Sequence, residues 1–135
     1  MYLDANVFIR ASEQNSSACE RLLTNVQDGR LVGVSSELTY AEVLARPLKY
    51  GQRDLLALYE RVSSADWRLQ LVPVSKGLLR RAAEVQATAG GRLPDAIHVP
   101  SALATDCRCL ITSDARLKTV PAMPLLLIAH LPTES

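Results

Sequence analysis

Aromatic residues are scarce in this sequence, and their scarcity narrows the functions open to its 135 residues. Phe, Trp and Tyr make up 4% of the chain, too few for an RNA-binding sheet whose exposed aromatic side chains stack on the bases. The 6 Gly and 7 Pro exclude a collagen-like or low-complexity chain. With 48% hydrophobic and 21% charged residues, the composition predicts a single globular domain over residues 1–135.

The sequence also has few cysteines, no long apolar run and little net charge. Cys19, Cys107 and Cys109 are odd in number and lack the C-x-x-C spacing of structural zinc sites, so we expect free thiols in a reducing compartment. No run reaches the roughly 18 apolar residues of a membrane span, which favours a cytoplasmic protein without membrane contact. The 15 Lys and Arg against 14 Asp and Glu exclude binding of nucleic acid by bulk charge.

Apolar segments alternate between strand-like and helical patterns along the chain. Short, uniformly apolar strands separated by helices predict an α/β fold with a mostly parallel sheet covered on both faces. The third helix is expected to end before Pro47, since the residue before a proline avoids helical backbone. The expected strands are 2–3, 31–34, 69–72, 109–111 and 125–128, and the expected helices 5–9, 16–28, 35–46, 52–63, 75–89 and 94–105.

Two acidic residues directly follow expected strands. Asp4 comes after the first strand, and Asp114 follows the strand at 109–111. Because ligand sites in parallel sheets gather at the carboxyl ends of the strands, we expect both side chains at that edge. Each also has a structural explanation, since Asp4 can cap the helical turn at Ala5 and Asp114 a turn after it.

Two further acids interrupt apolar faces of expected helices. Glu42 is the only charge in residues 39–45, where its spacing places it on one stripe with three apolar residues. Asp95 begins a similar stripe on the helix at 94–105. Glu42 can also be a solvated helix acid, and Asp95 a first-turn acid favoured by the helix dipole. The apolar residues of the two stripes are Leu38, Ala41 and Ala45, and Val99, Ala102 and Leu103.

Four carboxylates from four segments would repel one another if they met at one edge of the sheet. Divalent cations such as Mg²⁺ or Mn²⁺ bind oxygen ligands and would relieve this repulsion. A metal held in this way suits phosphodiester hydrolysis, because it activates a bound water and neutralises charge on the phosphate oxygens. The sequence therefore predicts a metal-dependent hydrolase site.

Four motifs in order give the chain a resemblance to a known family. The sequence resembles PIN-domain ribonucleases, and more narrowly the VapC-type toxins of type II toxin–antitoxin systems. The likeness covers almost the whole chain. The motifs are Tyr-Leu-Asp-Ala-Asn-Val-Phe-Ile at 2–9, Ser-Glu-Leu-Thr-Tyr-Ala-Glu-Val-Leu at 36–44, Leu-Pro-Asp-Ala-Ile-His at 93–98, and Leu-Ile-Thr-Ser-Asp-Ala-Arg-Leu at 110–117.

The resemblance implies a PIN-like three-layer α/β/α sandwich and a Mg²⁺- or Mn²⁺-dependent endoribonuclease. It assigns metal binding and catalysis to Asp4, Glu42, Asp95 and Asp114, and makes Asn6 and Thr112 polar residues that orient a carboxylate or a bound water. It further implies a homodimer, an RNA substrate and a cognate VapB-like antitoxin that covers the acidic site, often through an arginine whose charge replaces that of the metal.

Two positions depart from the family pattern. Many relatives carry another acid two residues beyond the fourth one, where this chain has Arg116, so the number of metal ions is open. Pro100 replaces a usual alanine in a helix, where a proline removes one hydrogen bond and crowds Ala96. Either change is compatible with a second reading, in which the chain is a PIN-like module that binds a partner without catalysis.

Basic residues near the motifs are candidates for other roles. Arg10, Arg46 and Arg92 are candidates for binding RNA phosphates. His98 lies three residues after Asp95 and either hydrogen-bonds it, contacts substrate or serves the structure. A metal-independent ribonuclease that uses His98 and His130 as acid and base is a further alternative.

Overall fold

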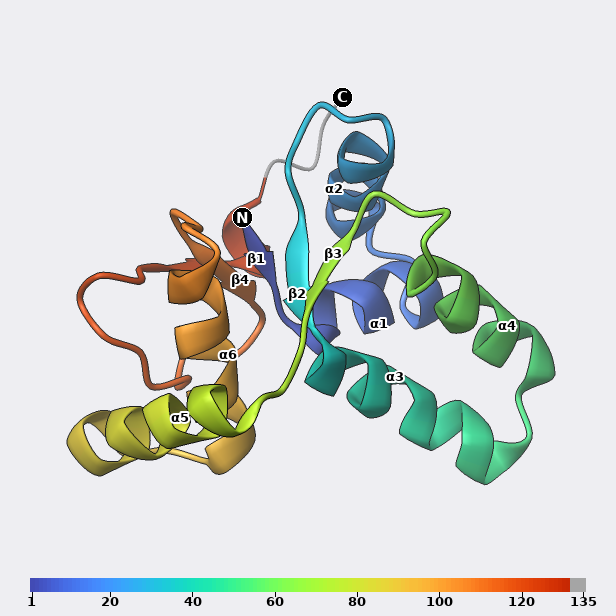
Figure 1. The fold of residues 1–135 in the computed structure, drawn as a ribbon. Helices are drawn as coiled ribbons and strands as arrows, with labels where there is room; N and C mark the ends of the chain where they lie inside the picture. The colour runs from blue at the N-terminus through green and yellow to red at the C-terminus, as the bar shows by residue number, and fades with distance from the viewer. Residues whose placement is uncertain (132–135) are drawn as a thin grey trace.

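The computed structural model describes residues 1–131, which form an α/β fold around a five-stranded sheet (Figure 1). All strand pairs are parallel, and the strand order is β3-β2-β1-β4-β5. This confirms the predicted fold class. The strands are β1 (Tyr2–Leu3), β2 (Val34–Ser36), β3 (Gln70–Val72), β4 (Leu110–Thr112) and β5 (Leu125–Leu127).

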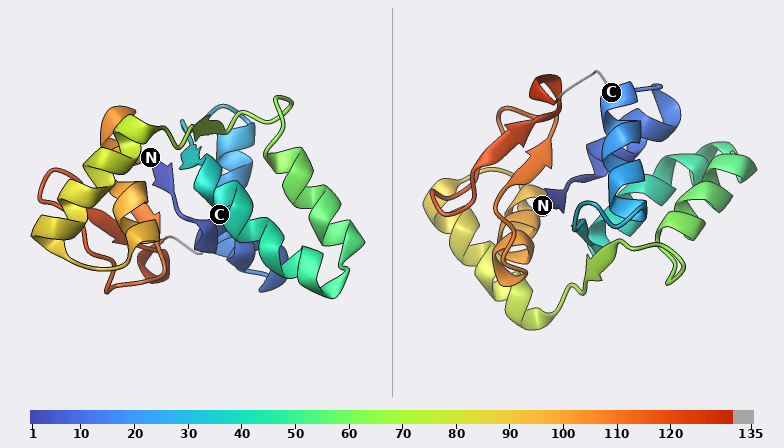
Figure 2. Two further views of the ribbon diagram at one scale, coloured as in Figure 1. Left: turned by 60° about the horizontal axis from the view of Figure 1, so that its bottom comes forward. Right: turned by 90° about the horizontal axis from the view of Figure 1, so that it is seen from above.

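Helices cover both faces of the sheet (Figure 2). Side chains alternate along the short strands, so Leu3 and Ile111 pack with the first four helices, whereas Tyr2 and Leu110 pack with the last two. Among the described residues, no helix has the length and hydrophobicity to span a membrane. The helices are α1 (Ala5–Glu13), α2 (Ser17–Gln27), α3 (Glu37–Tyr50), α4 (Arg53–Val62), α5 (Lys76–Ala89) and α6 (Leu93–Ala104), followed by a short 3₁₀ helix (Ile128–His130).

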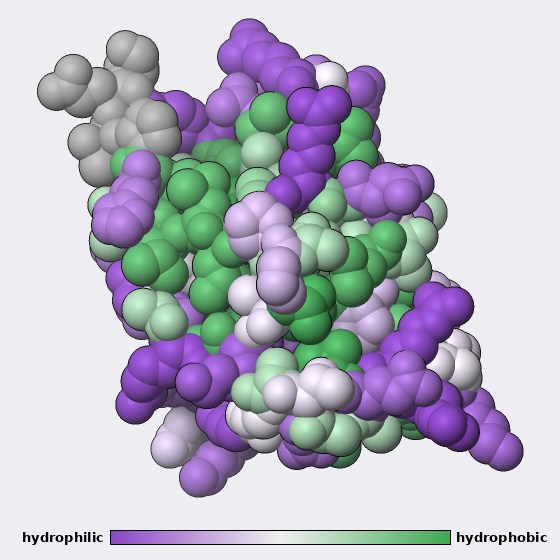
Figure 3. All heavy atoms as spheres, turned by 90° about the vertical axis from the view of Figure 1, so that its left-hand side faces the viewer, coloured by the Kyte–Doolittle hydropathy of each residue, from purple (hydrophilic) through white to green (hydrophobic). Residues whose placement is uncertain are grey.

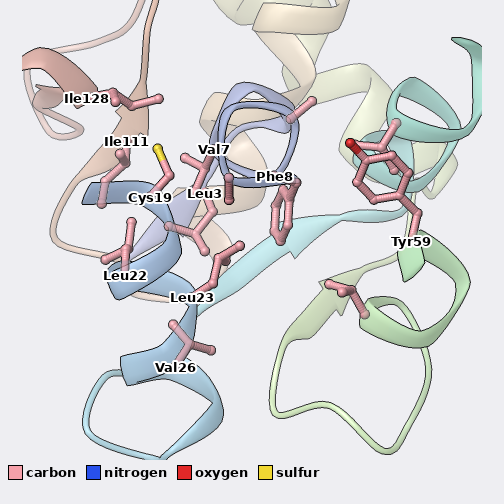
Figure 4. Close-up of a cluster of buried hydrophobic side chains, with 14 of the residues drawn as sticks. Leu3, Val7, Phe8, Cys19, Leu22, Leu23, Val26, Tyr59, Ile111 and Ile128 are labelled. Carbon is pink, nitrogen blue, oxygen red and sulfur yellow. The ribbon is translucent and has the colours of Figure 1, made fainter. Parts of the chain in front are cut away.

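The larger core lies under α1–α4. Phe8 from α1 and Tyr59 from α4 are 3% and 1% exposed and form its aromatic part (Figure 4). Cys19 of α2 is fully buried among aliphatic side chains, as expected for a free thiol. The two cores on opposite faces confirm the predicted three-layer sandwich.

Two helices continue through prolines. The prediction that α3 ends before Pro47 is wrong, because the helix runs on to Tyr50 and ends at Gly51, whose φ of 63° is left-handed. Pro47 is buried, so packing of its ring compensates for the lost donor, and its carbonyl accepts hydrogen bonds from Gly51 and Gln52. Pro100 is likewise buried within α6, which is assigned as helix from Leu93 to Ala104.

The second strand is displaced relative to the sequence prediction. We expected strand at 31–34, but β2 spans Val34–Ser36, with Val34 beside Tyr2 of β1. Two serines fit this buried strand because their hydroxyls find partners. Ser35 donates to the Leu3 carbonyl at 2.6 Å, and Ser36 accepts from the Leu38 amide at 3.0 Å as the cap of α3.

Two glycines give a test of this packing. A Cβ added at Gly33 would lie 2.8 and 2.9 Å from the Val26 methyl carbons, whereas one at Gly77 in α5 would meet only Ser75 Oγ at 3.9 Å. We expect Gly33→Ala to lower the free energy of unfolding by about 1–3 kcal/mol through overpacking. Gly77→Ala should raise it by about 0.5 kcal/mol. Urea unfolding followed by circular dichroism measures both, and equal effects would contradict this packing.

Candidate active site

The topology brings two of the predicted acids together at one point of the sheet. The chain leaves β1 toward β2 and β3 on one side and returns to β4 and β5 on the other, so β1 and β4 flank the point where the strand order reverses. Leu3 pairs with Ile111, which places Asp4 beside Thr112 at the carboxyl ends of these strands. Such switch points are where open α/β sheets bind ligands.

Asp4 is held by hydrogen bonds to both of its carboxylate oxygens. Its side chain is largely buried, with the residue 6% exposed. The Asn6 amide donates to Oδ1 at 2.8 Å and the Thr112 hydroxyl donates to Oδ2 at 2.5 Å. Thr112 Oγ1 in turn accepts from the Asp114 amide at 3.1 Å. Thr112 therefore joins the Asp4 carboxylate to the Asp114 backbone, and Asp4 is also the N-cap of α1, because its side chain accepts from the Asn6 backbone amide.

Asp114 is paired with the basic residue that departs from the family pattern. The Arg116 amide donates to Asp114 Oδ1 at 2.9 Å, and the Arg116 guanidinium Nε lies 3.4 Å from the same oxygen. The hydrogen bond from this amide and the nearby guanidinium hold the pKa of Asp114 below its usual range. Asp114 is therefore an ionised carboxylate with a cation beside it.

Asp95 lies in the first turn of α6 and responds to the charges around it. Burial raises the pKa of Asp95, and repulsion from Asp4 and Asp114 raises it further. Arg92 and His98 act in the opposite direction. Asp95 is thus electrostatically coupled to both strand-end acids, although the three come from different segments of the chain.

Glu42 lies in the second turn of α3 and contacts α6 through His98. Its side chain is 33% exposed, and its Oε1 lies 3.0 Å from His98 Nε2. The other ring nitrogen, Nδ1, lies 2.6 Å from the Tyr2 hydroxyl. His98 is 2% exposed, so it bridges two protein side chains rather than bonding to Asp95, as one of the sequence alternatives had it.

The apolar stripe predicted around Glu42 is wrong. Leu38 is only partly buried, and Ala41 and Ala45 are exposed. Glu42 nevertheless lies at the border of the buried face, because it directly precedes Val43. The buried residues of α3 are Thr39, Val43, Leu44 and Pro47. On α6 the corresponding prediction holds for Val99 and Ala102, whereas Leu103 is 38% exposed.

Comparison with known proteins identifies the family. Residues 1–123 match the family model of the PIN domain. The chain belongs to the PIN domain family. No curated protein sequence matches it, and its similarity to solved structures is one of fold rather than of sequence.

Three solved structures illustrate this likeness over nearly the full length of the chain. A toxin–antitoxin complex from Klebsiella pneumoniae has 20% identity and a TM-score of 0.65, covering 91% of this chain and 98% of that one. VapBC2 from Rickettsia felis, bound to a DNA fragment from its promoter, has 17% identity, a TM-score of 0.68 and coverage of 93% and 96%. FitAB bound to the IR36 DNA fragment has 15% identity, a TM-score of 0.73 and coverage of 97% and 96%.

The donor set of this PIN domain fits a hard divalent cation. All four acids offer carboxylate oxygens, the ligands that Mg²⁺ prefers. Within residues 1–131, no three Asp, Glu, His or Cys side chains form a ready-made metal cage. Mg²⁺ commonly keeps several waters and takes only one or two protein carboxylates directly, so an open set of acids suits it. Burial is the main cause of the raised pKa of Asp95, and the charges of Asp4 and Asp114 act in the same direction.

The predicted phosphate-binding arginines occupy three different places in the PIN domain. Arg92 directly precedes α6, and its charge acts on both Asp95 and Asp114. Arg46 lies one turn beyond Glu42 on α3, with its guanidinium 5.8 Å from the ring centre of Tyr50. Arg10 is in the last turn of α1, the end of that helix opposite to Asp4. Arg92 therefore has the direct connection to the acids.

Removing the Thr112 hydroxyl tests the link between β1 and β4. In Thr112→Val the buried Asp4 carboxylate loses a donor, so we expect the free energy of unfolding to fall by about 1–3 kcal/mol. Thr112→Ser keeps the hydroxyl and should recover most of that loss. Chemical denaturation of both variants measures the difference, and equal stability of the two would show that the hydroxyl does not support Asp4.

The stability of Asp95→Asn should depend on pH in a defined direction. Because the pKa of Asp95 is raised above its usual 3.8, the folded protein binds the proton more tightly than the unfolded chain. This stabilisation is present at low pH and is lost as the pH rises through the folded pKa. At about pH 7 the charged Asp95 therefore lowers the free energy of unfolding, and the neutral side chain of Asp95→Asn does not.

We expect the melting temperature of Asp95→Asn minus that of the wild type to increase from acidic to neutral pH. Differential scanning calorimetry in low-metal buffer measures it. A difference that stays constant across this range would contradict the electrostatic coupling of Asp95.

Proposed function

We propose that this PIN domain is the toxin of a toxin–antitoxin pair and cleaves RNA as a Mg²⁺- or Mn²⁺-dependent endoribonuclease. The observation that carries the proposal is the coupling of acids from separate segments at the switch point of the sheet. The Thr112 hydroxyl joins the Asp4 carboxylate to the Asp114 backbone, and burial together with the charges of Asp4 and Asp114 raises the pKa of Asp95. Burying charge in this manner costs stability, which is typical of sites that bind a cation. We further propose that residues 1–135 act as one domain.

The residues divide the chemistry between them. Asp4, Glu42, Asp95 and Asp114 would hold the divalent ion, which supplies an activated water and neutralises charge on the phosphate. Thr112 and the Asn6 amide keep the Asp4 carboxylate oriented. Arg92, whose charge acts on two of the acids, attracts the RNA phosphate to the same edge.

A cognate VapB-like antitoxin is the partner that this acidic edge best accommodates. Two of the similar structures are described as toxin–antitoxin or VapBC complexes, which supports such a partner here. An arginine from the antitoxin would form charge-assisted hydrogen bonds with the acids and replace the positive charge of the metal. Inhibition and metal binding would then compete for the same carboxylates.

Two histidines offer a weaker catalytic arrangement. His98 is almost completely buried and both of its ring nitrogens lie at hydrogen-bond distance from protein atoms. His130 is exposed on the 3₁₀ helix that follows β5. A general acid or base must reach the substrate proton, which favours the carboxylates over this pair.

The first experiment measures cleavage of a structured RNA by the purified protein. We expect cleavage with Mg²⁺ or Mn²⁺, none with EDTA, and a rate at least about 100-fold lower for Asp4→Asn, Glu42→Gln and Asp95→Asn. Asp54→Asn, an exposed acid in the first turn of α4, is the matched control and should retain the wild-type rate. Mapping RNA ends in cells that express the wild type or Asp95→Asn then identifies the cleaved RNA.

Two outcomes would contradict this function. Cleavage that persists in EDTA would favour the histidines, and an intact, folded protein that neither cleaves RNA nor binds Mn²⁺ would favour a non-catalytic PIN module. Thermal denaturation separates these cases, because Mn²⁺ that binds the folded state raises the melting temperature.

A homodimer is the expected assembly, and the face formed by α5 and α6 is its candidate contact. Leu79 of α5 and Leu103 of α6 are 41% and 38% exposed. A groove of about 450 Å³ between these helices includes Pro100 and Leu103 in its lining. Figure 3 views the side of the molecule on which these helices lie and shows hydrophobic side chains gathered between hydrophilic ones. Large exposed apolar patches mark interaction surfaces.

Charge substitution tests this contact. We expect the wild type to sediment as a dimer and Leu103→Lys to shift it toward monomer, because the lysine would be desolvated in the interface. Val32→Lys, at a position 74% exposed before β2, is the control and should leave the dimer intact. A Leu103→Lys protein that remains fully dimeric would exclude this face as the contact.

A further inference from the structure

A chain of three polar side chains runs from the interior of the sheet to the acidic edge. Tyr2 of β1 is 0% exposed, and its hydroxyl lies 2.6 Å from His98 Nδ1. His98 of α6 places Nε2 3.0 Å from Oε1 of Glu42 on α3. The three residues come from positions far apart in the sequence, and only the Glu42 end is partly open to solvent.

Tyr2 and Glu42, the outer residues of this series of three side chains, determine the direction in which its hydrogen bonds run. Tyr2 is fully buried and carries a neutral phenol hydroxyl, which has a hydrogen to donate. When His98 Nδ1 accepts a hydrogen bond from this hydroxyl, the neutral imidazole carries its hydrogen on Nε2. A doubly protonated imidazole also has a hydrogen on Nε2. In both forms Nε2–H donates to the Glu42 carboxylate.

We propose that His98, oriented by the Tyr2 hydroxyl, is a positioning residue that fixes the Glu42 carboxylate for the metal. The proposal rests on the proposed function of the acidic site. Glu42 has three rotatable side-chain bonds, and one directed hydrogen bond from a buried ring restricts its carboxylate to few orientations. Ligand carboxylates are commonly held by such outer partners, whose loss weakens metal affinity 10- to 100-fold in general.

The burial of His98 makes it suitable for this task. At 2% exposure its ring is surrounded by protein, and Tyr2 prevents it from turning over, because a flipped ring would lose the hydrogen bond to the phenol. No buried side-chain nitrogen or oxygen in residues 1–131 lacks a partner. The three side chains Tyr2, His98 and Glu42 therefore form a polar network in which every buried group has a partner, and such a network is rigid.

The central experiment is a double-mutant cycle on Mn²⁺ affinity, measured by electron paramagnetic resonance without RNA. The four proteins are the wild type, His98→Ala, Glu42→Gln and the double variant. We expect His98→Ala to raise the Mn²⁺ dissociation constant about 10-fold or more in the wild type and less than about 2-fold in the Glu42→Gln background, since His98 acts through Glu42. His130→Ala, which removes an exposed histidine, should leave the affinity unchanged.

Side-chain replacements at His98 separate positioning from packing. Glutamine can place an amide N–H near the position of Nε2, whereas asparagine is too short to reach Glu42. His98→Gln should therefore recover most of the Mn²⁺ affinity, and His98→Asn should not. Tyr2→Phe, which keeps the ring but removes the hydroxyl, should weaken binding by less than His98→Ala does.

The nitrogen NMR spectrum of the wild-type imidazole gives a readout that needs no variant to fold. We expect Nε2 of His98 to carry a hydrogen. An unprotonated Nε2 in the wild type would overturn the proposal.

Asp95→Asn, measured beside the cycle, distinguishes failure of the proposed metal site from failure of the positioning role of His98. If the wild type does not bind Mn²⁺, or if Asp95→Asn binds it as tightly as the wild type, the proposed function of the site falls and this inference with it. If Asp95→Asn weakens Mn²⁺ binding but His98→Ala does not, or weakens it equally with and without Glu42, the site stands and the positioning role of His98 is wrong.

Discussion

The placement of acidic side chains at one edge of the sheet is the constraint around which the rest of this PIN domain is organised. Asp4, Asp95 and Asp114 come from three segments; burial raises the pKa of Asp95, and the charges of Asp4 and Asp114 raise it further. Each acid has local compensation. Asp4 receives two hydrogen bonds, Asp114 has Arg116 beside it, and Asp95 starts a helix whose dipole favours negative charge. The compensation is incomplete at Asp95, which is where a divalent cation would act most strongly.

The support of this edge is polar and lies in the interior. Ser35 bonds to the backbone of β1 and to the Thr39 hydroxyl, Thr112 bridges two strand ends, and His98 joins Tyr2 to Glu42. These side chains are nearly or completely buried, and all of them have partners. An apolar interior would provide the same packing without fixing the direction of any carboxylate, so the polar residues contribute orientation.

Much of this arrangement could be predicted from the sequence. Apolar periodicity predicted the alternation of strands and helices, and the positions of Asp4 and Asp114 after strands predicted their common edge. The failures concern interactions that are distant in sequence. Pro47 continues a helix because its ring is buried by tertiary packing, and β2 contains two serines because their hydroxyls meet β1 and α3. No local pattern could pair His98 with Tyr2, although a tyrosine in a buried strand needs a hydrogen-bond partner.

The shortness of β1 has a consequence for how this chain can vary. Tyr2 faces one core, Leu3 faces the other, and Asp4 turns into the acidic edge, so three successive residues serve three separate environments. Side chains alternate along a strand. An insertion or deletion of one residue before Asp4 would therefore shift Tyr2, Leu3 and Asp4 into environments that do not suit them. Insertions should therefore accumulate in distal loops, such as the one between α4 and β3, while the spacing within the opening tripeptide stays fixed.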